Sequence, residues 1–127
     1  MKIVVLNGSP KRSGTVATLL KKVVEGLGPD THVEWLNVSE MTIRPCTACM
    51  RCRSGGGCVL PQDDAHRLAA LLGEADLLVV GTPTHWGNMS SPLKALLDRN
   101  VPLFMGESPR GLPLPRQKGK PAAIVTA

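Results

Sequence analysis

The chain has 127 residues, of which 43% are hydrophobic, and it carries a formal net charge of +5. Two tryptophans and one phenylalanine are its aromatic residues, so we expect one domain with an aliphatic core and no nucleic-acid partner, because nucleic-acid binding usually needs stacking aromatics beside a continuous basic face. No run of about 18 apolar residues is present that could cross a membrane. The N-terminus also lacks the charged and apolar regions of an export signal, which favours a cytoplasmic protein.

The first expected strand, residues 2–6, is a short β-branched apolar run, which is typical of a buried parallel strand. The loop Gly8-Ser-Pro-Lys-Arg-Ser-Gly14-Thr15 follows it and leads into a helix whose apolar residues recur from Val16 to Leu27. Backbone N–H groups, three hydroxyls and a helix N-terminus together predict a phosphate cradle. The loop is neither a Walker A loop nor a G-x-G-x-x-G loop. The alternative is an ordinary strand-to-helix turn.

All four cysteines follow the second expected strand, residues 32–38. Their spacing is C-x2-C-x2-C-x5-C, and a run of three glycines precedes the last of them; they are Cys46, Cys49, Cys52 and Cys58. The spacing is close to that of bacterial ferredoxins, although the last interval is longer and no proline follows. A compact set of thiolates in a chain without an export signal predicts a [4Fe–4S] cluster and a role in electron transfer.

Three other interpretations of the cysteines remain open. A zinc site is one, although zinc usually takes two C-x2-C pairs separated by a longer loop. A dithiol switch is another, in which Arg51 and Arg53 would lower the thiolate pKa. The third is a loop in which some cysteines only pack and no metal binds.

A helix capped by Asp63 or Asp64 leads to the third expected strand, residues 76–80, and the segment 81–90 leaves that strand. Within this segment a proline fixes the backbone, Trp86 offers an apolar plate, and the following Gly-Asn pair lets the main chain approach a flat ligand. The segment therefore predicts the floor for a ring system. The alternative is a structured turn with a partly buried tryptophan.

The next helix begins at Ser91-Pro92, since proline is favoured in a first helical turn. A Gly/Pro-rich stretch, residues 106–119, then leads to the fourth expected strand, residues 121–126. Alternating strands and helices predict an α/β protein: a doubly wound parallel sheet in three layers, with ligands bound beyond the carboxyl ends of the strands.

The loop 8–15, the compact cysteines followed by Asp63-Asp64, and the segment Pro83-Thr-His-Trp-Gly-Asn-Met-Ser-Ser-Pro-Leu-Lys-Ala-Leu-Leu-Asp-Arg99 resemble motifs of a known family. The chain is similar to the NADPH-dependent FMN reductase branch of flavodoxin-like proteins, and within it to the iron–sulfur flavoproteins. The likeness runs over residues 1–127, and its third motif is the most specific.

The resemblance implies a flavodoxin-like fold, FMN, a homo-oligomer, and NAD(P)H or a ferredoxin-like carrier as electron donor or acceptor. The FMN phosphate would be held by Ser9, Lys11 or Arg12, Ser13, Gly14 and Thr15. The flavin ring would lie against Pro83, Thr84, His85, Trp86, Gly87 and Asn88. The resemblance also implies a [4Fe–4S] cluster on Cys46, Cys49, Cys52 and Cys58.

The chain departs from the family pattern at three places. Val16 stands where a threonine is usual, which removes one hydroxyl from the phosphate site, and His85 stands where the family often has tyrosine. The sequence also stops at Ala127, after the fourth of the five strands that a flavodoxin-like sheet normally has. We therefore expect a single FMN-binding domain over residues 1–127 that is truncated and lacks a C-terminal helix, strand and helix.

The predicted function is that of an FMN-dependent oxidoreductase that passes electrons between FMN and the cluster, with no side chain assigned as catalytic acid or base. His66 is expected to be structural or on the surface, and His32 to have no chemical role. Two alternatives differ in class. One is an NAD(P)H-dependent FMN or quinone reductase without a cluster, and the other is a non-catalytic flavodoxin-like module that senses redox state or zinc.

Overall fold

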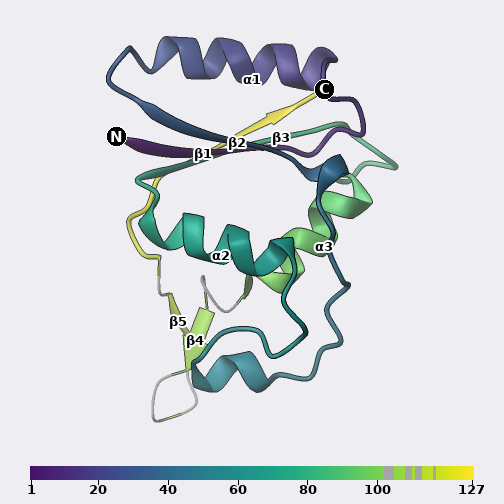
Figure 1. Ribbon diagram of the computed structural model, residues 1–127, viewed down its shortest axis with the longest axis vertical. Coiled ribbons are helices and arrows are strands. Elements are labelled where there is room, and N and C mark those ends of the chain that lie inside the picture. The colour runs from purple at the N-terminus through teal and green to yellow at the C-terminus, as the bar shows by residue number, and fades with distance from the viewer. Residues whose placement is uncertain (102–104, 108–109, 111–112, 116) are drawn as a thin grey trace.

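The computed structural model describes residues 1–101, 105–107, 110, 113–115 and 117–127 (Figure 1). Four parallel strands form the main sheet in the order β2-β1-β3-β6. Their bounds are β1 Lys2–Asn7, β2 His32–Asn37, β3 Leu77–Thr82 and β6 Ala122–Thr126. These four strands coincide with the four expected from the sequence to within two residues at either end.

Helices cover both faces of this sheet, so that the molecule has three layers (Figure 1). One face carries α1, and the other carries α2 and α3. Their bounds are α1 Thr15–Gly26, α2 Asp64–Glu74 and α3 Ser91–Arg99. The predicted doubly wound parallel sheet is confirmed.

The core is divided by the sheet because alternate residues of a strand point to opposite faces. In β1, Val4 and Leu6 pack with α2 and α3, whereas Ile3 and Val5 pack with α1. All four of these side chains are at most 2% exposed. A strand buried on both faces reads as a continuous apolar run, which is why β1 was evident in the sequence.

Two short strands were not predicted. β4 (Met105–Glu107) and β5 (Pro113–Pro115) pair antiparallel and form a separate two-stranded sheet. β4 begins one residue before the Gly/Pro-rich stretch 106–119, and β5 lies within it. Residues 108–109, 111–112 and 116 of that stretch are outside the described residues. Between β2 and α2 the chain carries two 3-10 turns, Val38–Glu40 and Arg51–Ser54.

Two glycines let the central strands approach their neighbours closely. A Cβ added to Gly81 at the end of β3 would lie 2.6 Å from Leu20 and 2.7 Å from Val16 of α1. One added to Gly8 after β1 would lie 2.8 Å from the Gly81 carbonyl oxygen and 2.8 Å from Leu93 of α3. The loops at this edge of the sheet therefore have no room for side chains at these two positions.

We expect Gly81→Ala to reduce the free energy of unfolding by about 1–3 kcal/mol, because the added methyl group must displace packed side chains of α1. Urea denaturation followed by far-ultraviolet circular dichroism measures the change. Gly73→Ala is the matched control, because Gly73 lies in α2 with nothing within 4 Å of an added Cβ. That change should stabilise the chain by up to about 1 kcal/mol. Equal stability of Gly81→Ala and the wild type would contradict the close packing.

Candidate functional site

The loop between β1 and α1 is folded by the side chain of Asn7, which is completely buried at the end of β1. Its amide nitrogen donates to the Lys11 carbonyl oxygen at 3.3 Å and to Oδ1 of Asn37 at 3.1 Å. Its own Oδ1 accepts a hydrogen bond from the Ser9 backbone at 3.2 Å, and Ser9 Oγ accepts one from the Lys11 backbone at 3.1 Å. Sequence reasoning missed Asn7; the signal was a polar residue ending a fully apolar strand.

The N-terminus of α1 opens onto this loop without a capping side chain. Gly14 occupies the N-cap position and provides no side-chain hydrogen bond, and the first turn contains no acidic residue. The first N–H groups of a helix have no partner within the helix, and they carry a partial positive charge that favours anions. Local sequence thus leaves these donors available to a ligand.

A cavity of about 510 Å³ lies at this helix N-terminus. Hydroxyls from the first loop, one lysine and two residues of the loop after β3 surround it. Its described lining residues are Ser9, Pro10, Lys11, Ser13, Gly14, Thr15, Val16, Pro83, His85 and Ala127. Hydroxyl groups, an ammonium group and free helix N–H groups, with no acid among these residues, suit a phosphate group.

The two walls of the cavity are joined by hydrogen bonds. The Gly8 backbone N–H donates to the Gly81 carbonyl oxygen at 2.8 Å, and the buried Ser90 hydroxyl donates to the Gly8 carbonyl oxygen at 2.6 Å. Ser90 N–H in turn donates to the Thr82 hydroxyl at 3.0 Å. The loops after β1 and β3 are therefore held together at the carboxyl edge of the sheet, where the sequence predicted a ligand site.

Some of the residues predicted for this site lie elsewhere. Arg12 pairs with Glu40 at 2.9 Å and is not among the lining residues. Trp86 is fully exposed, with a φ of 49° at the tip of a turn that is closed by backbone hydrogen bonds between His85 and Asn88. Thr84, Gly87 and Asn88 also do not line the cavity among the described residues. A pattern of residue types cannot show which way a loop tip points.

The cysteine segment wraps around a second cavity, of about 360 Å³. All four thiols line it, together with apolar residues and residues from the end of α3. The described lining residues are Cys46, Thr47, Ala48, Cys49, Met50, Cys52, Arg53, Cys58, Val59, Leu60, Asp98, Arg99 and Val101. The segment turns tightly: Ala48 and Met50 have φ values of 53° and 62°, and the glycines at 55–57 all have positive φ. The run of three glycines before Cys58 thus adopts a backbone with positive φ, which glycine tolerates because it has no Cβ.

The thiols differ in their surroundings. The backbone N–H of Arg51 lowers the pKa of Cys49 by hydrogen bonding to its sulfur, and burial raises the pKa of Cys52, which the negative charges of the other three sulfurs raise further. Cys46 Sγ accepts from the Ala48 backbone at 3.4 Å. Within the described part of the chain, no three His, Cys, Asp or Glu side chains stand in a metal-holding arrangement. The four thiols thus share one cavity without forming a closed ligand cage.

A buried ion pair stands behind the cysteine cavity. Arg99 Nη1 and Nη2 donate to the two Asp63 carboxylate oxygens at 2.7 and 3.0 Å, and both side chains are at most 2% exposed. Asp63 also caps α2, accepting from the Ala65 backbone at 3.1 Å, and accepts from the Arg44 backbone at 2.9 Å. Although burial alone would raise the pKa of Asp63, the hydrogen bonds from Arg99 and Arg44 hold it well below the usual value of 3.8.

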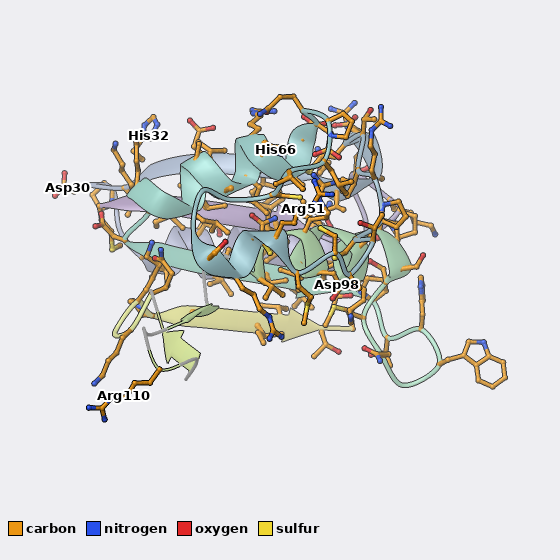
Figure 2. All side chains as sticks on the ribbon, turned by 90° about the horizontal axis from the view of Figure 1, so that it is seen from below. Asp30, His32, Arg51, His66, Asp98 and Arg110 are labelled. Carbon is orange, nitrogen blue, oxygen red and sulfur yellow. The ribbon has the colours of Figure 1, made fainter. Side chains whose placement is uncertain are left out.

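His66 ties this ion pair to the last cysteine. Its Nε2 lies 3.1 Å from the Cys58 carbonyl oxygen, which can only accept, and its Nδ1 accepts from the Asp63 backbone N–H at 3.2 Å. Figure 2 looks onto this side of the molecule, with His66, Arg51 and Asp98 near the middle of the view and Asp30 and His32 at one end of it. His66 is therefore structural, and His32 is an exposed residue that contacts Glu34 at 3.5 Å.

Comparison with known proteins gives one family and several relatives. The model of a family described as NADPH-dependent FMN reductase matches residues 1–127. An iron–sulfur flavoprotein of Methanocaldococcus jannaschii is 29% identical over 107 residues, which are 84% of this chain and 55% of that protein. One of Archaeoglobus fulgidus is 32% identical over 108 residues, 84% of this chain and 52% of the relative. The chain thus spans about half the length of these relatives.

Solved structures show the same fold. An azoreductase of Bacillus anthracis superposes with a TM-score of 0.76 at 16% sequence identity, over 98% of this chain and 67% of that one. At this identity the likeness supports the flavodoxin-like arrangement of strands and helices alone. Among the described residues there is also no helix both long and apolar enough to cross a bilayer.

We expect Asp63→Asn to lower the free energy of unfolding by about 3–5 kcal/mol at pH 7, because Arg99 would stay buried without its counter-charge. The folded-state pKa of Asp63 lies below 3.8, so its contribution is fully present above about pH 4 and is lost as the pH falls towards the folded-state value. The variant should therefore lose less stability than the wild type between pH 5 and pH 2, as measured by urea denaturation.

Asp98→Asn serves as the control for this pH series, because Asp98 is a half-exposed carboxylate that pairs with Lys94 at the surface. Its effect on the free energy of unfolding should stay within about 0.5 kcal/mol. Equal losses on acidification in Asp63→Asn and the wild type would show that the buried pair does not govern acid stability.

Proposed function

The chain belongs to the NADPH-dependent FMN reductase family, and on that premise we propose that it is an FMN-dependent oxidoreductase that passes electrons between FMN and a [4Fe–4S] cluster. The observation that carries the proposal is the hydroxyl-lined cavity at the start of α1, which also meets the loop after β3. Ligands of doubly wound sheets bind at this edge of the strands.

The first loop suits the phosphate of FMN. Ser9, Ser13 and Thr15 supply hydroxyls, Gly14 leaves the helix N–H groups uncapped, and Lys11 supplies positive charge. Lys11 is the better candidate of the two cations predicted for this role, because Arg12 is engaged by Glu40. Asn7 positions the loop from below through its hydrogen bonds to Lys11 and Ser9.

We assign the flavin ring to the side of the cavity formed by Pro83 and His85. The rest of that loop, Thr84 and residues 86–88, remains a prediction for ring contacts. Bound FMN supplies the ability to accept a hydride as a pair of electrons and to release the electrons singly. The chain's own residues bind the phosphate and orient the ring against the loop at the carboxyl end of β3, where His85 is a hydrogen-bonding group.

The cysteine cavity suits an iron–sulfur cluster in its donor chemistry. Four thiols face one space lined by apolar side chains such as Met50, Val59 and Leu60. N–H groups already donate to the sulfurs of Cys46 and Cys58. Cysteine thiolates are the usual ligands of [4Fe–4S] clusters, and hydrogen bonds to the sulfurs tune them. Cys46, Cys49, Cys52 and Cys58 would hold the cluster, which supplies one-electron transfer.

The proposal extends to the setting of this reaction. We propose that residues 1–127 contribute one FMN-binding domain, that the protein forms homo-oligomers in the cytoplasm, and that NAD(P)H or a ferredoxin-like carrier exchanges electrons with it. The names of the two archaeal relatives as iron–sulfur flavoproteins support the cluster. The basic residues Arg51 and Arg53 beside the cysteines would favour an acidic carrier over a basic one.

The test is the absorption spectrum of protein purified without oxygen, with iron and acid-labile sulfide counted on the same sample. Flavin bands near roughly 370 and 450 nm above a broad absorbance that bleaches with dithionite are expected. Flavin without iron would leave an FMN reductase whose cysteines have another role. Zinc without flavin would favour the sensing module, and a colourless, metal-free protein would refute the redox function.

Thr15→Ala should weaken FMN binding about tenfold or more, because a hydrogen bond to a charged phosphate contributes about 1.5–3 kcal/mol. Quenching of FMN fluorescence on titration with the apoprotein measures the dissociation constant. Thr18→Ala is the matched control: this threonine lies one turn further along α1, and its hydroxyl donates to the Gly14 carbonyl oxygen at 3.1 Å. Equal dissociation constants for the two variants would argue against a phosphate at the helix start.

A further inference from the structure

Arg99 reaches a cysteine sulfur with its side chain from the buried side of the cavity. It ends α3, and its side chain is 0% exposed. Its Nε lies 3.2 Å from Cys58 Sγ, which is hydrogen-bonding distance for an N–H donor and a sulfur acceptor. Arg99 is not among the residues that the sequence predicted for either cofactor site.

The position of the Nε–H group is fixed by the other bonds of the guanidinium. Nη1 donates to Asp63 and, at 2.8 Å, to the Arg44 carbonyl oxygen, while Nη2 donates to the other Asp63 oxygen. The second Nη2 N–H group lies near His66 Nδ1, with 3.5 Å between the nitrogens. The guanidinium is planar, so the bidentate pair with Asp63 also sets the direction of Nε–H. Nε–H therefore points at the sulfur of Cys58.

Cys58 is consequently held at two points. Arg99 binds its sulfur, and His66 Nε2 donates to its carbonyl oxygen at 3.1 Å. Cys46 and Cys49, by contrast, are exposed on the cysteine segment and receive hydrogen bonds from neighbouring backbone N–H groups. Cys58, the fourth ligand of the proposed cluster, is thus anchored to α2 through His66 and to α3 through Arg99. The first three cysteines carry no such anchor among the hydrogen bonds described above.

We propose that Arg99 is a positioning residue for the iron–sulfur centre: its Nε–H bond to Cys58 raises the reduction potential of the cluster and fixes the fourth ligand. The inference rests on the proposed function, because it requires the cluster. Reduction adds one electron and no proton, so the centre becomes more negative and a bond donated to its ligand sulfur becomes stronger. Hydrogen bonds to the sulfurs are a recognised determinant of such potentials.

The effect on the reduction potential depends on the orientation of the Arg99–Asp63 pair more than on its net charge. Asp63 neutralises Arg99 overall, but the guanidinium faces the sulfur and the carboxylate lies behind it. In a cavity lined largely by apolar side chains, such an oriented pair acts with little screening by water. Arg51 provides a contrast, because it carries the same charge on the cysteine segment but is exposed to solvent.

Two variants remove the bond in different ways. Arg99→Lys keeps the positive charge, but a lysine ammonium lacks the planar fork that pairs with Asp63 and donates to Cys58 together. The double variant Asp63→Asn/Arg99→Met removes both charges at once, so no unpaired charge stays buried, and asparagine retains the α2 cap. Arg51→Gln is the control that removes a positive charge from the surface of the same segment.

The experiment is an anaerobic dithionite titration of each FMN-loaded protein with redox mediators, in which the reduced cluster is counted by electron paramagnetic resonance. At a fixed ambient potential, the ratio of reduced to oxidised cluster should fall about tenfold in Arg99→Lys and in the double variant, which is about 59 mV for one electron. In Arg51→Gln the ratio should change less than about twofold. If Arg99→Lys fails to fold, the double variant alone decides.

Wild-type potentials in both Arg99 variants would overturn the inference while leaving the proposed function intact. An equal fall in Arg51→Gln would also overturn it, because a general charge effect would then explain the potential. A wild-type protein without iron and sulfide would instead refute the cluster itself, and the inference with it. These outcomes are told apart by the metal count made on the wild type before any titration.

Discussion

The buried pair between Asp63 and Arg99 holds together four parts of the chain, from Arg44 to the end of α3. Asp63 caps α2, Arg99 ends α3, and the two contact the backbone at Arg44 and the sulfur of Cys58. Burying two charges is costly, and a hydrophobic pair can be as stable. The ion pair adds geometric specificity, because each of its hydrogen bonds requires a particular partner. These bonds fix how the cysteine segment packs against α2 and α3.

The parallel sheet brings together the walls of the cavity at the start of α1. Because β1 and β3 are neighbours with the same direction, their following loops meet at one edge. The helix after β1 then directs its N-terminus to that edge, and Asn7 shapes the intervening turn from inside the core. The proposed phosphate and ring sites would thus combine residues about seventy positions apart in sequence.

Much of this arrangement could be predicted from sequence. β1 and β3 were evident because buried parallel strands are uninterrupted apolar runs, and the loop from Ser9 to Thr15 was evident because its hydroxyls and glycines follow such a run. The orientation of individual side chains was not: Arg12 turns to Glu40, and Trp86 faces solvent. Arg99 was missed because its role arises from contacts between distant segments, such as the one with Cys58, 41 positions away. Asn7 was missed because its bonds to Ser9 and Lys11 depend on how the loop after β1 folds.

The hydrogen bonds that link Gly8, Gly81 and Ser90 have a consequence for the energetics of ligand capture. Where a site is formed by independent loops, part of the attraction for a ligand is spent on ordering the backbone as it binds. Here the two walls share hydrogen bonds within the folded chain, and the glycine contacts leave them little freedom to separate. The loss of backbone entropy is therefore incurred once, when the protein folds, and not again with each ligand that enters.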